Sequence, residues 1–90
     1  MAELDHVAIA VLPVIQELEV REKVWGPNHL VTAHCLNDLA GLYRSMGNFA
    51  KALPLLQRAI EIETKVLGPD HRDVATALGN LAGLHVSTGD

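Results

Sequence analysis

The chain reads KVWGPNH over residues 23–29 and KVLGPDH over residues 65–71, so one pattern returns after 42 positions. The tetrapeptide LAGL follows each copy at the same distance. Aligned at this offset, residues 17–48 and 59–90 share 14 identities in 32 positions. A fixed period of this length is the signature of an architecture built from repeated structural units.

The Gly-Pro pairs within these segments predict where helices end. Glycine accepts the backbone conformation that closes a helix, and proline cannot continue the hydrogen-bond ladder. The residues that follow, Asn28 or His29 and Asp70 or His71, are candidates to cap the next helix, and Asn48 is another. These helix ends and capping positions predict four helices, at Leu4–Val24, Val31–Ser45, Phe49–Val66 and Asp73–Ser87.

Apolar residues recur every three or four positions within these segments, which is the helical period. One such stripe in the second predicted helix returns in the fourth, and its members are Leu36, Leu39, Ala40 and Tyr43, then Leu78, Leu81, Ala82 and His85. The third helix is apolar on two sides, through Ala52, Leu56, Ala59 and Ile60 on one face and Leu55, Ile62 and Val66 on another. A helix of this kind is expected between two layers of a stacked array.

The spacing of these residues resembles the tetratricopeptide repeat. Leu36-x₂-Leu39-Ala40-x₂-Tyr43 fits that family's W-x₂-L-G-x₂-Y pattern, with Leu for Trp and Ala for Gly, and Gly47 supplies the turn. Ala52-x₃-Leu56-x₂-Ala59 supplies the packing pattern of the second helix of a repeat. The 42-residue period, with Gly-Pro-Asp-His between repeats, is similar to the extended repeats of kinesin light chain and nephrocystin.

This resemblance implies an all-α chain, a fragment of an α-solenoid with four antiparallel helices. We expect one domain over residues 1–90, in which one full helix pair is flanked by two single helices. The expected divisions are an N-terminal helix or partial repeat over 1–25, a full repeat over 26–67 and a half repeat over 68–90.

Composition excludes several classes of function. The formal net charge is −4, and the basic residues after position 45 are scattered, so no basic stripe exists to neutralise phosphates and nucleic acid is not an expected partner. The apolar run Val7–Ile15 is too short to span a bilayer and is predicted to be a buried helix segment. Cys35 is the one cysteine, which favours a reducing compartment and a cytoplasmic location.

In the tetratricopeptide family the first helix of each pair lines a groove that holds a polypeptide. Carried over to this sequence, the resemblance implies binding residues at His34, Asn37, Asp38, Gly41, Arg44, Thr76, Asn80 and Gly83, with Ser45, Gly79 and Ser87 on the same face. Asn side chains offer both a donor and an acceptor to a peptide backbone. For Gly41 and Gly83, close packing between helices is the favoured alternative.

Other candidate sites are weaker. The five histidines lack zinc-site spacing, and His29 and His71 fit capping positions, so no metal and no cofactor are expected. Cys35 is predicted to be a small buried residue, and His85 a packed substitute for Tyr. Glu61 and Glu63 are predicted to lie on a solvated helix surface, and no catalytic set is present.

The sequence therefore predicts a non-catalytic scaffold that binds a protein or peptide on the face of the second and fourth helices. The alternative is a self-assembly module that forms a homodimer or larger oligomer, through exchange of a helix for example. Its motivation is the missing mate of the last helix, which is expected to leave some of Leu78, Leu81, Leu84 and Val86 uncovered.

Overall fold

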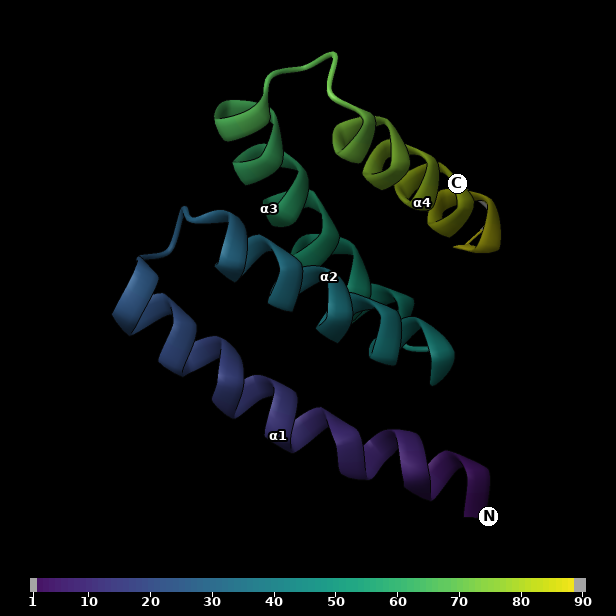
Figure 1. Ribbon diagram of the computed structural model, residues 1–90. Helices are drawn as coiled ribbons and strands as arrows, with labels where there is room; N and C mark the ends of the chain where they lie inside the picture. The colour runs from purple at the N-terminus through teal and green to yellow at the C-terminus, as the bar shows by residue number, and fades with distance from the viewer. Residues whose placement is uncertain (1, 89–90) are drawn as a thin grey trace.

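The computed structural model describes residues 2–88, with side chains for residues 9–87. Residues 2–88 form four α-helices, each antiparallel to the next along the chain (Figure 1): α1 (Ala2–Trp25), α2 (Leu30–Ser45), α3 (Phe49–Leu67) and α4 (Arg72–Thr88). The predicted bounds differ from these by at most two residues, so the all-α prediction is confirmed. The side chains of Val7 and Ala8, and residues Gly89 and Asp90, lie outside the described part.

The turns between helices depend on glycine and histidine. Gly26 and Gly68 close α1 and α3 with almost equal φ angles of +93° and +94°, a region that side chains other than glycine rarely adopt. His29 caps α2, because its Nδ1 accepts the Val31 N–H at 3.0 Å. His71 does the same for α4, accepting the Asp73 N–H at 3.0 Å. The two segments that define the repeat therefore fold into like turns, and the histidines are the capping residues.

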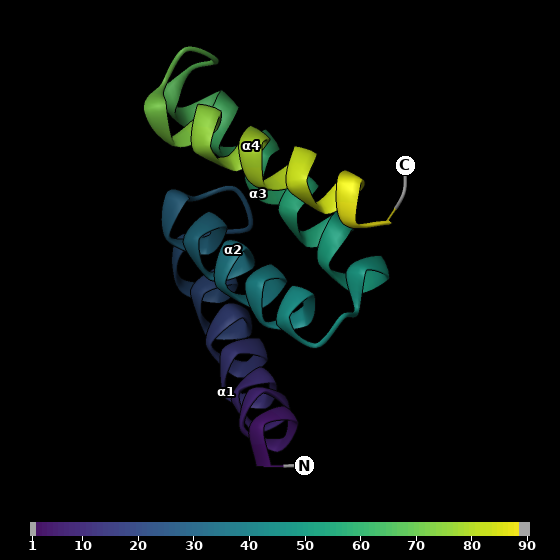
Figure 2. The same cartoon turned by 90° about the vertical axis from the view of Figure 1, so that its right-hand side faces the viewer.

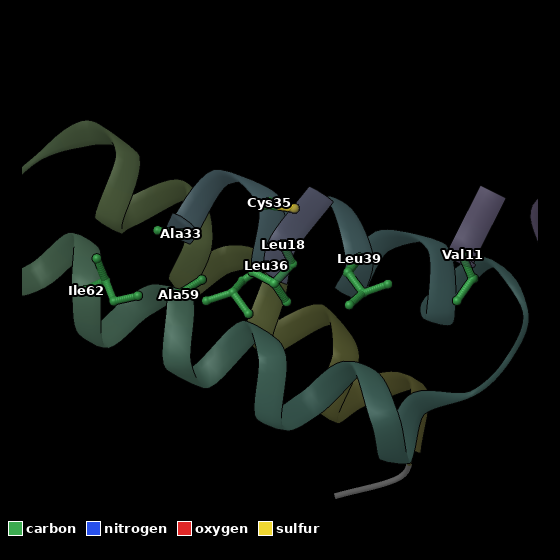
Figure 3. Close-up of a cluster of buried hydrophobic side chains, with 8 residues drawn as sticks. All are labelled: Val11, Leu18, Ala33, Cys35, Leu36, Leu39, Ala59 and Ile62. Carbon is green, nitrogen blue, oxygen red and sulfur yellow. The ribbon is translucent and has the colours of Figure 1, made fainter. Parts of the chain in front are cut away.

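The larger apolar cluster joins the first three helices (Figure 3). α1 contributes Val11 and Leu18, and the rest of the cluster is Ala33, Cys35, Leu36 and Leu39 from α2, and Ala59 and Ile62 from α3. All of these side chains are at most 9% exposed. α2 is thus packed between α1 and α3, which explains why its apolar stripe is buried.

A smaller cluster attaches α4. Leu84 is 1% exposed and packs with Ala40 of α2 and with Ala52 and Leu56 of α3. α4 lies along α3, at the opposite end of the array from α1 (Figure 2). The described chain is a thin body, with principal extents of 41 × 34 × 17 Å.

Some of the predicted apolar faces remain open. Leu78 corresponds to the buried Leu36 after one period, yet it is 48% exposed, because α4 packs mainly on α3 and no helix within residues 2–88 covers its opposite side. Val86 is 80% exposed, whereas Leu81 is partly buried. Val66 of α3, predicted to face a neighbouring layer, is also exposed.

Two arginines add polar links between helices that also share the apolar cluster. Arg58 of α3 donates to the Glu22 carboxylate of α1 at 3.3 Å and to the Pro27 carbonyl oxygen at 3.0 Å. Arg21 of α1 donates to the Val31 carbonyl oxygen of α2 at 3.1 Å. These contacts fix the turn between α1 and α2 against α3.

Candidate functional site

Two adjoining pockets lie between α2 and α4, above α3. The smaller has a volume of about 60 Å³ and is lined by Asn37, Ala40, Gly41, Arg44, Ala52, Leu56, Asn80 and Leu84. The larger, of about 280 Å³, is lined by His34, Asn37, Glu63, Asp73, Thr76, Ala77 and Asn80. Asn37 and Asn80 line both pockets, so the two form one depression, which we call the α2–α4 groove. Neither pocket reaches the volume of about 300–1,000 Å³ typical of small-molecule sites.

Six of the eight predicted binding residues line the α2–α4 groove, namely His34, Asn37, Gly41, Arg44, Thr76 and Asn80. Asp38 and Gly83 are exposed but line neither pocket. Asp38 follows Asn37 by one residue, which turns its side chain by about 100° around a helix of 3.6 residues per turn. The sequence therefore brings the chosen residues onto one face of the array with two exceptions.

The glycines of the LAGL repeats do not serve close packing. A Cβ atom placed on Gly41 or on Gly83 would meet no atom within 4 Å, apart from the helix's own backbone. The expectation of tight helix contact at these two positions is therefore wrong. Gly41 instead leaves helix backbone uncovered beside the groove. Ser45 and Ser87 donate to the carbonyl oxygens of Gly41 and Gly83, each at 3.0 Å.

Glu63 corrects another expectation, because it lies inside the structure and not on a solvated surface. Its side chain is 3% exposed at the base of the larger pocket, whereas Glu61 is exposed as predicted. Glu63 follows Ala59 by four residues and Leu56 by seven, a spacing that continues the buried face of α3. The prediction of a solvated surface considered the charged residues near Glu63 and overlooked this spacing.

The base of the groove holds one hydrogen bond between two helices. The Asn37 side-chain amide donates to Glu63 Oε1 at 2.9 Å, which joins α2 to α3. Asn37 Oδ1 is buried and accepts no hydrogen bond from the described residues. Buried polar atoms are nearly always paired, so this oxygen stands out.

Cys35 is buried at 2% exposure, as predicted, and its Sγ donates to the Val14 carbonyl oxygen at 3.6 Å. Burial raises the pKa of the Cys35 thiol above its ordinary value, with a smaller increase from nearby carboxylates and an opposing effect of Arg21. Nucleophilic cysteines have lowered pKa values and are accessible. Cys35 is therefore a buried packing residue, as predicted from the sequence.

A metal site and a membrane-spanning helix are alternatives to the groove, and the described residues bear on both. Within the described part of the chain, no three His, Cys, Asp or Glu side chains gather into a group that can hold a metal ion. Of the helices described, none has the length and apolar character needed to cross a membrane. His85 is partly buried in the last turns of α4.

Comparison with known proteins agrees with the helical architecture. A search of curated proteins found no match to the chain. The family model described as tetratricopeptide repeat matches residues 15–63 and again residues 39–90. Each match covers more than half of the chain, and the two together include both Gly-Pro turns. The chain belongs to the tetratricopeptide repeat family.

Proposed function

We propose that the chain is an adaptor that holds a polypeptide in the α2–α4 groove. Tetratricopeptide repeats generally mediate protein–protein interactions and are generally not catalytic. The observation that carries the proposal is the pair of adjoining pockets, lined from two helices and centred on Asn37 and Asn80. An extended peptide needs such a paired set of donors and acceptors along its path.

The groove residues suit a peptide backbone. The Asn80 amide has both a donor and an acceptor, and the exposed Arg44 guanidinium can form a bidentate pair with a carboxylate. Gly41 lets a ligand approach the helix backbone, because no side chain stands over it. The apolar side of the smaller pocket, formed by Leu56 and Leu84, supplies contact for an aliphatic group.

The test blocks the groove without disturbing the fold. Gly41→Trp places an indole in open space beside the smaller pocket, and Gln57→Trp places the same group on an exposed position of α3 as the control. Peptides are selected by display on the immobilised wild-type chain, and their affinities are measured by fluorescence anisotropy. We expect Gly41→Trp to weaken binding at least tenfold and Gln57→Trp to change it less than twofold.

Two outcomes contradict the proposal. One is a selection that yields no peptide with saturable binding to the wild-type chain. The other is a set of peptides that bind Gly41→Trp and Gln57→Trp equally well. Circular dichroism at 222 nm is the check that both variants keep their helices.

Three finer assignments accompany this proposal. The 42-residue period supports membership of the extended type of repeat found in kinesin light chain and nephrocystin. The Gly-Pro turns support repeat divisions at residues 26–67 and 68–90, after the N-terminal segment 1–25. The single, reduced cysteine supports a cytoplasmic location.

Self-association is the second candidate function, and an apolar stripe on the outer face of α1 favours it. The stripe consists of Ile9, Leu12, Val20 and Val24, with exposures of 68%, 67%, 59% and 67%. Their spacing places them on one side of α1, opposite Val11 and Leu18 of the core. Exposed apolar side chains gathered on one side of a helix favour an interaction surface.

Light scattering tests this second function. We expect a mass above that of one chain at about 100 μM, and a decrease over a hundredfold dilution. Leu12→Lys with Val20→Lys, both on the stripe, is expected to give the mass of one chain throughout. Ala50→Lys with Gln57→Lys, at exposed positions of α3 away from the stripe, is the control for added charge. A wild-type mass of one chain at every concentration would remove self-association.

A further inference from the structure

Glu63 is a buried acidic side chain without a basic partner. It is 3% exposed, and its one hydrogen bond within the described structure is the one from Asn37. The ion pairs among the described residues involve Glu17, Glu22 and Asp73, not Glu63. Glutamates are rarely buried unless they are paired, because the charged form loses its hydration. The position therefore lacks the cation that would normally accompany it.

The unmatched atoms at this position are all acceptors. Asn37 directs its amide nitrogen to Glu63, and its buried Oδ1 has no donor among the described residues. The second carboxylate oxygen of Glu63 also receives no hydrogen bond from the described residues. Asp73 adds a further carboxylate to the lining of the same pocket. A group that completes the site must bring several N–H donors and a positive charge.

In the first copy of the repeat, a basic residue stands at the position that matches Glu63. One period before Glu63 is Arg21, whose guanidinium donates to the Val31 carbonyl oxygen at the start of α2. Val31 corresponds in turn to Asp73, at the start of α4. The second copy thus has a carboxylate beside an open pocket, at a position where the first copy has a guanidinium that belongs to the chain.

We propose that the larger pocket of the α2–α4 groove binds the cationic end of a lysine or arginine side chain of the partner polypeptide. The proposal rests on the groove being the binding face. Glu63 forms the ion pair, and Asn37 Oδ1 and Asp73 accept the remaining N–H groups. The pocket volume of about 280 Å³ suits one long side chain.

The test uses small probes, so it does not depend on finding a partner. Butylguanidinium and butylammonium carry the two candidate cations, and 1-butanol is the neutral probe of similar size. Each is titrated into the ¹⁵N-labelled chain, and the side-chain amides of Asn37 and Asn80 are followed by NMR. We expect saturable shifts with at least one cation and much smaller shifts with 1-butanol.

A pair of matched variants tests whether the carboxylate of Glu63 binds the cation. Glu63→Gln keeps the size of the side chain and an acceptor for the Asn37 amide, while Glu61→Gln makes the same charge change at an exposed site on α3. We expect Glu63→Gln to weaken cation binding at least tenfold and Glu61→Gln less than twofold. Circular dichroism and the NMR spectrum of the free chain show whether each variant is folded.

The proposal is overturned if 1-butanol shifts the same resonances as strongly, if no saturable shift occurs, or if the two variants weaken binding equally. Peptides that bind the groove but carry no lysine or arginine would also overturn it, and would leave the adaptor function standing. Cation binding without any selected peptide would leave this pocket standing and remove the adaptor function.

Discussion

Gly26 and Gly41 are glycines for different reasons, one in a turn and the other within a helix. A Cβ atom would meet nothing within 4 Å at either position, but Gly26 has a φ of +93° and Gly41 lies in the middle of α2. A side chain at Gly26 is strained by the backbone itself, whereas at Gly41 it lowers the conformational entropy of the unfolded chain. Opposite effects on stability are therefore expected from the same substitution.

We expect Gly41→Ala to raise the free energy of unfolding by about 0.5–1 kcal/mol, which is the helix-propensity difference between the two residues. For a chain of this size, that corresponds to a rise in Tm of a few degrees. Gly26→Ala is expected to lower the free energy of unfolding by about 1 kcal/mol or more. Urea titrations followed by circular dichroism measure both, and a destabilised Gly41→Ala variant would contradict the open surroundings of that residue.

Cys35 gives stability a dependence on alkaline pH. Because burial raises its pKa, the folded chain keeps the thiol proton at a pH where the unfolded chain releases it. The free energy of unfolding is therefore expected to decrease as the pH rises above about 9, the ordinary value for this thiol. Cys35→Ala removes this contribution, and a slope that is unchanged in the variant would assign it to other groups.

At the scale of helices, residues one period apart differ in burial because their helices have different neighbours. Leu36 and Leu78 occupy matching positions, but α2 has a helix on either side and α4 has α3. We expect Leu36→Ala to cost about 2–5 kcal/mol, as for other buried leucines, and Leu78→Ala less than about 1 kcal/mol. Urea titrations of both variants give the comparison, and equal costs would show that α4 is covered in solution.

Arg58 ties α3 to the α1 end of the array through two hydrogen bonds. Its side chain is about one-third exposed, so solvent weakens the ion pair with Glu22. We expect Arg58→Ala to lower the free energy of unfolding by about 1 kcal/mol, with little recovery in Arg58→Lys, because an ammonium lacks the guanidinium fork. Gln57→Ala on the exposed side of the same helix is the control, and an equal loss there would contradict a specific role.

The existence and bounds of the helices were predictable because the signals that set them are local. Gly-Pro followed by histidine ends one helix and caps the next within seven residues, and both copies do so. Burial was less predictable, since it depends on which helices are adjacent. Leu36 and Leu78 carry the same local pattern and differ in exposure for that reason.

The groove was predictable to the extent that it follows one helix face. Asn37, Gly41 and Arg44 were carried over from the family resemblance and line the pockets, while Asp38, carried over in the same way but one step around α2, does not. Glu63 was missed because it comes from α3, the helix beneath, and because it lies between two basic residues of that helix, Arg58 and Lys65. Only the packing of α2 on α3 brings it against Asn37.

For the molecule as a whole, the order of the helices along the chain is also their order in space (Figure 1). Each helix contacts its neighbours in sequence, so stability is expected to decrease towards the ends of the array. We expect the amide protons of Leu36, Leu39 and Ile62 to exchange with solvent most slowly, and those of the last turns of α4 to exchange at least tenfold faster. Uniform protection along the chain, measured by NMR in deuterated buffer, would contradict this gradient.

The one-sided packing of α4 has a mechanical consequence. α4 buries Val74, Ala77 and Leu84 and has α3 as its main neighbour, whereas α2 and α3 each pack between two helices, so α4 can shift against the others more easily than either of them. The width of the α2–α4 groove would then be adjustable, and one sequence could accommodate side chains of different sizes.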